Sequence, residues 1–229
     1  MSASAPKKPC EIVLLRHAHS TANEKGILAG RDNSVGLTER GREQAQSVAD
    51  FLASEKFDAI YVSDLKRCRE TIAPLLKKTG SKANFGKAII EMDYGTWSGK
   101  SLKQLAKHKL WAQIQSRPST VRFPSGESFA EMSLRANQAV LDMASGKSKI
   151  LVLSHGDVIK SIVAYHLALP LDNFQRIAVD PASITRIRYS PSHLIELNSI
   201  AHLRSGVSTS NKNSGANPGH SLGGGAGRA

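Results

Sequence analysis

The 229-residue sequence predicts an α/β fold, a three-layer α/β/α sandwich with helices on both faces of a mostly parallel sheet. The first observation behind this prediction is that short apolar runs alternate with amphipathic helical patterns. The second is that two strand-like segments follow one another near the C-terminal end, joined near Pro191. Adjacent strands with a short connection pair antiparallel, so we expect an antiparallel strand at the edge of the sheet.

The N-terminal half begins the alternation. Residues 11–15 (EIVLL) have the apolar composition of a buried strand. Thr38 is suited to cap the next helix. The apolar residues of that helix recur at helical spacing, at Ala45, Val48, Ala49 and Leu52. Residues 59–62 (AIYV) are expected to form the second strand, and a helix should run from about Leu65 to just before Gly80.

The C-terminal half continues it. The segment Ser128-Phe129-Ala130-Glu131 has the sequence of a capping box, which predicts the start of a helix. Apolar residues then recur on one helical face, at Met132, Ala136, Ala139, Val140 and Met143. Residues 150–153 (ILVL) predict a third buried strand, and residues from about 157 to 169 a helix. The late strands are expected at residues 183–189 and 194–197.

The sequence predicts one folded domain at residues 10–204. It lies between a flexible arm, residues 1–9, and a tail, residues 205–229, whose Gly, Ser and Asn content is too polar to offset the entropy of ordering. No apolar run approaches the roughly 18 residues of a membrane span, so no membrane partner is expected. The N-terminus has no secretory signal, and two cysteines make no disulfide framework. These features predict a cytoplasmic protein.

The formal net charge is +12. A basic surface is compatible with nucleic acid or with small anions. However, no five basic residues are consecutive, and only 5% of residues are aromatic, which leaves few stacking platforms for bases. We therefore expect a small phosphorylated substrate and no nucleic-acid partner; a basic surface without special use is the alternative. The oligomeric state is left open.

Basic and polar residues follow the ends of three predicted strands. Arg16 and His17 follow the first, Arg67 lies shortly after the second, and His155 follows the third. The carboxyl ends of parallel strands meet at one edge of a sheet, so these side chains should converge. Guanidinium forks match phosphate oxygens. The pattern therefore predicts a site for a phosphoryl group.

Six motifs carry a resemblance to the histidine phosphatase superfamily, which has the phosphoglycerate mutase-like fold. They are Arg16-His17-Ala18-His19-Ser20 with Asn23; Leu37-Thr38-Glu39-Arg40-Gly41 with Gln44-Ala45; Ser63 to Thr71 with Leu65-Lys66-Arg67; Glu91 to Gly99 with Gly95 and Trp97; Pro124 to Ser128; and Ser154-His155-Gly156. They occur in the family's order between about residues 11 and 170. Ala18 stands where the family pattern has glycine.

The resemblance implies a metal-independent phosphatase without a cofactor. His17 would attack phosphorus and become phosphohistidine. Glu91 would protonate the leaving oxygen and later activate water. Arg16, Arg67 and His155 would stabilise the charge on the phosphoryl oxygens. The substrate-binding residues implied by the motifs are Arg16, Ser20, Asn23, Arg67, His155 and Gly156.

Several alternatives remain open at the level of sequence. Arg69 competes with Arg67, Asp93 competes with Glu91, and Asn23 serves a turn in the alternative interpretation. A phosphoglycerate mutase-type phosphomutase is the second function.

Cofactor-dependent mutases of the family carry an arginine directly after the acid and a lysine eleven residues after it. Here those positions hold Met92 and Leu102, which favours the phosphatase branch. A catalytically inactive binding protein is the third function class. The spacing His17-x-His19 also raises a metal hydrolase, but such enzymes need a longer barrel and more ligands.

Overall fold

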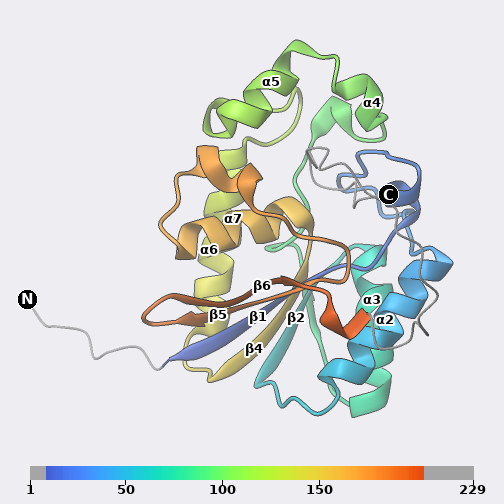
Figure 1. Cartoon of the computed structure of the whole chain (residues 1–229), viewed down its shortest axis with the longest axis vertical. Helices are drawn as coiled ribbons and strands as arrows, with labels where there is room; N and C mark the ends of the chain where they lie inside the picture. Colours follow the sequence, from blue (N-terminus) through green and yellow to red (C-terminus); the bar gives the residue numbers. More distant parts are fainter. Residues whose placement is uncertain (1–8, 204–229) are drawn as a thin grey trace, which may run out of the picture.

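The computed structural model describes residues 9–203 of the 229. Apart from Pro9, the predicted arm and tail lie outside these residues. The middle layer is a six-stranded sheet in the order β3-β2-β4-β1-β5-β6 (Figure 1). The strands are β1 (Cys10–Arg16), β2 (Ala59–Ser63), β3 (Asn84–Gly86), β4 (Lys149–Ser154), β5 (Ile184–Tyr189) and β6 (His193–Ser199).

Helices cover both faces of the sheet, as the sequence predicts. The α-helices are α1 (Thr21–Glu24), α2 (Glu39–Leu52), α3 (Lys66–Thr79), α4 (Leu102–Leu105), α5 (Lys109–Ser116), α6 (Phe129–Ala144) and α7 (Gly156–His166). In Figure 1, α2 and α3 lie on one side of the sheet and α6 and α7 on the other. None of the helices within residues 9–203 has the length and apolar character needed to cross a bilayer.

Strand β1 divides the core into two halves. Ile12 and Leu14 belong to the hydrophobic cluster that includes α6 and α7, whereas Val13 and Leu15 belong to the cluster that includes α2 and α3. This alternation follows from the two-residue period of a strand. Because both faces of β1 are covered, the strand is apolar throughout, and this is why its sequence is a continuous run.

The predicted strands and long helices are present, with small differences at their ends. The helix expected at residues 157–169 ends at His166, because Ala168 adopts a left-handed φ of 53° that the helix cannot continue through. Strand β3 was not predicted; two of its three residues, Asn84 and Phe85, are exposed and carry no apolar pattern. The antiparallel pairing lies where it was expected: β5 runs antiparallel to both β1 and β6.

The strand order places three strand ends next to one another. Strand β4 pairs in parallel with β1 on one side and β2 on the other. In this register Leu153 lies opposite both Leu15 and Val62. The residues that follow these three positions therefore leave the sheet at the same height. This brings together the ends of segments that are up to about 140 residues apart in sequence.

Helix α2 begins against the segment that follows β1. Thr38 caps the helix, accepting from the Gly41 main-chain nitrogen at 3.1 Å, and its own main-chain nitrogen donates to the His19 carbonyl at 3.0 Å. A Cβ atom at position 41 would lie 2.0 Å from that carbonyl oxygen. Only glycine permits this approach, which explains the glycine of the Leu-Thr-x-x-Gly motif.

Residues 95–128 form a cap beyond the carboxyl edge of the sheet, with α4 and α5 at its top (Figure 1). Aromatic side chains attach the cap to the core. Phe123 packs edge-on against Tyr94, Trp97 and Phe129, with ring centres 5.0–5.4 Å apart. Phe129 continues the contact to Phe174. Such pairs contribute beyond their buried area, so the cap is fixed at its base.

Candidate active site

His17 lies at the end of β1 with its main chain held on two sides. Its nitrogen donates to the Ser154 carbonyl at 3.0 Å, and its carbonyl accepts from Ala182 at 3.1 Å. Its Nδ1 lies 2.8 Å from the Ala18 carbonyl oxygen, which can only accept, so Nδ1 carries the proton. The lone pair is therefore on Nε2. Burial, together with the charges of Arg67 and Arg16, lowers the pKa of His17 well below its usual value, so the ring is neutral.

Arg16 points a buried guanidinium group into the same region. Its Nη1 donates to the Val179 carbonyl at 2.5 Å. Its Nε and Nη2 atoms are buried and have no acceptor within residues 9–203. Gly156 packs against this group, since a Cβ there would lie 3.4 Å from the Arg16 Cζ.

Arg67, in the first turn of α3, approaches from the other side. Main-chain oxygens of the loop before α2 fix its fork: Nη2 donates to Gly30 at 2.8 Å and Nη1 to Asp32 at 3.3 Å. Its Nε is also buried without an acceptor among the described residues. Arg69, the rival position, instead forms a surface ion pair with Asp64.

The two arginines thus present three buried donor nitrogens that no protein oxygen satisfies within residues 9–203. Leaving a buried charged donor unpaired costs free energy, about 1–3 kcal/mol or more for each group. Buried polar groups in folded proteins nearly always have partners. An anion with several oxygens, placed beside His17, would supply them.

His155 occupies the N-cap position of α7, and its ring centre lies 5.3 Å from that of His17. Nδ1 accepts from Arg67 Nη2 at 3.2 Å, because a guanidinium can only donate, and Nε2 lies 2.7 Å from the Ser63 hydroxyl. Burial and the charge of Arg67 lower the pKa of His155 well below its usual value. Nδ1 therefore carries no proton in this arrangement, and Nε2 donates to Ser63. A hydroxyl can also donate, so Ser63 permits the other neutral tautomer when Arg67 no longer binds Nδ1.

Ser63 was not among the predicted site residues. The signal that points to it is its position, since it is a polar residue at the end of a buried strand within a matched motif. It is fully buried and bonds the second histidine.

Glu91 is buried beside this cluster, with Oε2 3.8 Å from His155 Nδ1. Burial and then the charge of Asp157 raise its pKa to about 7, although Arg67 and a hydrogen bond from Met92 oppose the rise. Asp93, the rival acid, lies outside the cluster, since its carboxylate pairs with Arg31 and accepts from the main chain of Gly95.

The main chain of Glu91 is held by two arginines. Its carbonyl oxygen accepts from Arg31 Nε at 3.0 Å and from Arg135 Nη2 at 3.1 Å. Both arginines also pair with Glu127, which belongs to the Pro124–Ser128 motif. The motif therefore contributes to the placement of the acid from a distance of 36 residues in sequence.

Ser20 and Asn23 pair with each other as the capping box of α1. Asn23 Oδ1 accepts from the Ser20 main-chain nitrogen at 2.9 Å and from the Ser20 hydroxyl at 2.8 Å. The main-chain nitrogen of Asn23 donates to the Ser20 hydroxyl at 3.3 Å and completes the capping box, in which the side-chain nitrogen Nδ2 takes no part. The turn of the alternative interpretation is therefore observed, and the role of Asn23 in binding substrate stays a prediction.

Other groups singled out in the sequence do not join the cluster as reactive groups. Burial raises the pKa of Cys68 to about 12, so its thiol stays protonated. His19 bonds the Thr38 hydroxyl at 2.9 Å. Among the described residues, no three His, Cys, Asp or Glu side chains are grouped so that they would bind a metal ion.

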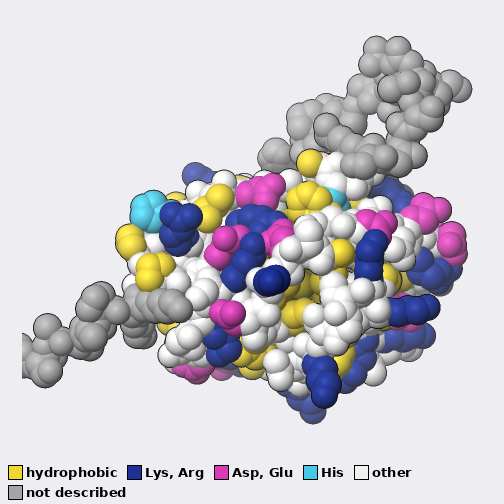
Figure 2. Space-filling view, turned by 90° about the horizontal axis from the view of Figure 1, so that it is seen from below, with side chains coloured by type: hydrophobic (Ala, Val, Ile, Leu, Met, Phe, Trp, Pro, Cys, Tyr) yellow, Lys and Arg dark blue, Asp and Glu magenta, His cyan; other side chains and the backbone are white. Residues whose placement is uncertain are grey.

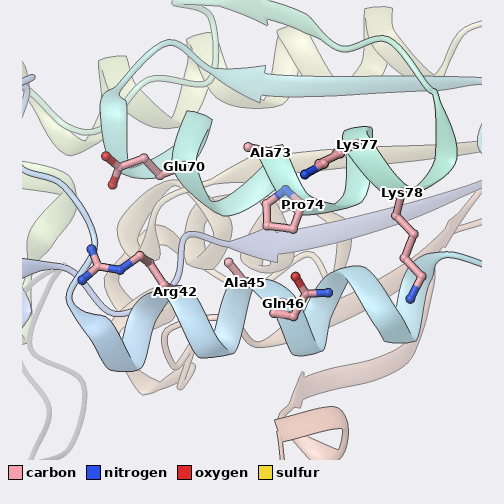
Figure 3. A pocket seen from close by; sticks show the side chains of 8 residues that line it. All are labelled: Arg42, Ala45, Gln46, Glu70, Ala73, Pro74, Lys77 and Lys78. Carbon is pink, nitrogen blue, oxygen red and sulfur yellow. The ribbon is translucent and has the colours of Figure 1, made fainter.

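A groove of about 810 Å³ between α2 and α3 is distinct from this cluster (Figure 3). It is lined by Arg42, Ala45, Gln46, Glu70, Ala73, Pro74, Lys77 and Lys78. It contains none of the histidines and neither of the buried arginines. The buried cluster at the strand ends, not this groove, is therefore the candidate active site.

Comparison with known proteins agrees with this geometry. The model of the "Histidine phosphatase superfamily (branch 1)" matches residues 12–199. A "Putative phosphoserine phosphatase 2" of Hydrogenobacter thermophilus is 32% identical over 198 residues, covering 84% of this chain and 97% of that protein. A "Probable phosphoglycerate mutase GpmB" of Salmonella choleraesuis is 29% identical, covering 80% of this chain and 86% of that protein.

Among solved structures, phosphoserine phosphatase from Entamoeba histolytica in complex with 3-phosphoglyceric acid superposes with a TM-score of 0.77 at 26% identity. The match covers 85% of this chain and 99% of that one. The family model spans almost the whole folded part, and the fold and the order of motifs agree with it. The chain belongs to the histidine phosphatase superfamily, branch 1.

Proposed function

We propose that this protein is a metal-independent phosphomonoesterase that acts on a small phosphorylated metabolite through a phosphohistidine at His17. The observation that carries the proposal is the pairing of a neutral histidine, whose lone pair is on Nε2, with three donors of Arg16 and Arg67 that have no acceptor in the described part of the chain. A nucleophile and a set of oxyanion donors at one buried point suit phosphoryl transfer.

In the first step, Nε2 of His17 forms a bond to phosphorus as the bond from phosphorus to the leaving oxygen breaks. Arg16 and Arg67 donate to the non-bridging oxygens, whose charge they offset. His155 joins them in the tautomer that carries its proton on Nδ1, which forms when Arg67 turns from His155 to the phosphoryl group and Ser63 donates to Nε2. Glu91 transfers its proton to the leaving oxygen, so an alcohol departs and a carboxylate remains. The raised pKa of Glu91 keeps that proton available near neutral pH.

In the second step, water attacks the phosphohistidine. The Glu91 carboxylate removes a proton from the water as oxygen bonds to phosphorus and the bond from phosphorus to Nε2 breaks. Inorganic phosphate leaves, His17 is again neutral, and Glu91 is again protonated. The electrostatic role that a metal ion often plays falls to the two arginines, so the cycle needs no cofactor.

The structure also supports a phosphatase over a mutase. Met92 is fully buried in the core, and Leu102 packs against the same core. Apolar side chains thus occupy the two positions at which the related mutases carry cations. The similarity to a protein named as a mutase makes that activity the alternative to measure.

The cap points to a substrate with a second negative charge. Residues 94–126 contain six lysines and arginines and no acidic residue. They are Lys100, Lys103, Lys107, Lys109, Arg117 and Arg122, and all six are exposed. A cationic cap above an anion site favours polyanions. Phosphoserine, for which the similar phosphatases are named, and 3-phosphoglycerate, which one of them binds, each carry a carboxylate in addition to the phosphate.

The test is turnover in the presence of EDTA. We expect the purified protein to hydrolyse p-nitrophenyl phosphate, phosphoserine and 3-phosphoglycerate at rates that EDTA leaves unchanged. Rapid acid quenching should trap acid-labile phosphate on a peptide that contains His17, and His17→Ala should abolish both turnover and label. Activity that disappears with EDTA and returns with a divalent ion contradicts the proposal, as does phosphate on another residue. Interconversion of phosphoglycerates primed by 2,3-bisphosphoglycerate, without net hydrolysis, would establish the mutase.

A further inference from the structure

Two segments distant in sequence lie side by side at the site: residues 89–94, which carry the acid, and residues 154–157, at the start of α7. Three contacts join them in the same order along both segments. They are Ser154 Oγ to the Ile89 carbonyl oxygen at 2.7 Å, His155 Nδ1 to Glu91 Oε2 at 3.8 Å, and Asp157 Oδ2 to the Tyr94 hydroxyl at 2.8 Å. The last of these contacts, the hydrogen bond between Tyr94 and Asp157, has no part in the two reaction steps proposed above.

Asp157 is a fully buried carboxylate. The Tyr94 hydroxyl donates to one oxygen, and Lys160, one helical turn further along α7, places its Nζ 3.7 Å from the other. Lys160 is itself 5% exposed and also donates to Gln175 at 3.1 Å. Asp157 lies in the first turn of α7, where the helix dipole favours a negative charge. These contacts hold the carboxylate in place, but a buried ion pair is costly and gives little net stability.

We propose that Asp157 is a positioning residue for the reaction. Through Tyr94 it fixes the segment that carries Glu91, and its negative charge favours the protonated form of that acid. This inference rests on the proposed function, because it assigns a role in delivering the proton to the leaving group.

The charges around Glu91 come from several elements. Arg16 at the end of β1 and Arg67 in α3 favour its ionised form, whereas Asp157 in α7 opposes ionisation. His155 is neutral, and Lys160, further along α7, interacts with both Asp157 and Glu91. On the main-chain side, Arg31 and Arg135 donate to the Glu91 carbonyl oxygen.

Two buried arginines beside a carboxyl group would normally keep it ionised. Burial is the largest cause of the raised pKa of Glu91, and the charge of Asp157 is the second. The buried carboxylate of Asp157 therefore offsets the effect on Glu91 of the positive charges of the two arginines, which the phosphoryl group requires. Without it, burial alone would oppose the arginines, and Glu91 would lose its proton at a lower pH.

The experiment compares pH profiles of kcat/KM for an alkyl phosphate, which needs the acid, and for p-nitrophenyl phosphate, which hardly does. This parameter reports the first chemical step only, so the later role of Glu91 as a base does not enter. Asp157→Asn keeps the shape and accepts from Tyr94 but removes the charge. We expect its basic limb on the alkyl phosphate to fall by about one pH unit. The matched control, Asp142→Asn, changes an exposed carboxylate of α6 and should leave the limb unchanged. A limb that stays in place or rises in Asp157→Asn overturns the assignment.

Tyr94→Phe provides the second arm, because it keeps the charge of Asp157 and removes only the hydrogen bond. We expect the basic limb to remain at the wild-type pH and kcat/KM to fall more on the alkyl than on the aryl phosphate. Equal losses on both substrates, or no loss, would refute the positioning role. If Asp157→Asn does not fold, this variant alone decides.

The proposed function and the role of Asp157 are tested by separate measurements. Wild-type turnover in EDTA and the phosphate label on His17 do not depend on Asp157, so their absence contradicts the proposed function itself. If both are present and the Asp157 and Tyr94 variants behave as wild type, the phosphatase stands and only the inference about Asp157 is wrong.

Discussion

At the scale of single residues, the site depends on which atom carries each proton. The Ala18 carbonyl fixes the proton of His17 on Nδ1 and so leaves Nε2 as the nucleophile. Ser63 orients His155 without fixing its tautomer. Glu91 places its carboxyl group 3.8 Å from His155 in the histidine and arginine cluster. Each of these assignments concerns the position of a proton. The dependence of the turnover rate on the leaving group and on pH therefore tests them.

Glu91→Gln tests the acid directly. The substitution keeps the shape of the side chain and removes its proton. We expect kcat on an alkyl phosphate to fall about 10²–10⁴-fold, whereas p-nitrophenyl phosphate, whose leaving group needs little protonation, should lose much less. Phosphohistidine should also accumulate, because the base of the second step is missing. Asp93→Asn is the matched control, since Asp93 pairs with Arg31 at the surface. A larger leaving-group effect in Asp93→Asn would show that the acid has been wrongly assigned.

The pH dependence follows from the direction of the pKa shifts. The pKa of Glu91 is raised to about 7, so Glu91 holds its proton below that pH and loses it above. We therefore expect kcat/KM for an alkyl phosphate to fall about tenfold per pH unit above roughly pH 7. The pKa of His17 is lowered, so the acid limb that reflects its protonation should lie well below pH 6.5.

The same profile measured for p-nitrophenyl phosphate controls for ionisation of the phosphate itself. Glu91→Gln should abolish the basic limb on the alkyl substrate. A limb that survives in this variant would show that another group titrates.

At the scale of elements, the ends of helices place the active residues. The start of α2 holds the chain just after His17, the first turn of α3 carries Arg67, and His155 immediately precedes α7. Each helix begins where a strand ends or a loop returns to the sheet. A change that displaces one of these helix starts should therefore affect stability and catalysis together.

Gly41→Ala tests this coupling. Its Cβ would collide with the His19 carbonyl, so α2 or the segment after β1 must move. We expect a loss of roughly 1–3 kcal/mol in the free energy of unfolding, typical of overpacking, and a lower kcat. Glu43→Ala, at an exposed position of the same helix, is the control and should change little. Denaturant unfolding measures both, and a wild-type midpoint for Gly41→Ala would contradict the close approach.

At the scale of the whole molecule, basic and acidic side chains are unevenly distributed. Residues 94–126, in and just before the cap, carry lysines and arginines and no acidic residue, whereas the face seen in Figure 2 has basic and acidic side chains side by side. On the sheet, Arg186 of β5 pairs with Glu11, Glu55 and Glu196. Positive charge balanced in this way does little to attract a substrate, whereas unbalanced charge near the site does.

The double variant Lys103→Gln/Lys107→Gln should therefore lower kcat/KM for a carboxylated phosphate by about two- to tenfold at low salt, with a smaller effect at high salt. Lys77→Gln/Lys78→Gln, at the far end of α3, removes the same charge at a distance from the cap and is the matched control. Stopped assays at two ionic strengths measure both. Equal effects of the two pairs would show that net charge, rather than the cap, attracts the substrate.

The sequence by itself determined the features that neighbouring residues encode. Buried strands appear as short apolar runs, and Ser128 and Thr38 predict helix starts because capping is a contact across three residues. The fold class follows from the alternation of these elements. The motifs that predict His17, Arg67, Glu91 and His155 can be recognised from the spacing of residues along the sequence.

Tertiary structure alone decided what depends on distant contacts. The order β2-β4-β1 brings Ser63 beside His155, and α7 brings Asp157 to Tyr94, 63 residues away. The short helices α4 and α5 and strand β3 have weak local patterns, and they form where the rest of the chain supports them. A hydrogen bond between segments so far apart depends on how the sheet is ordered and how helices pack, and no run of neighbouring residues records either.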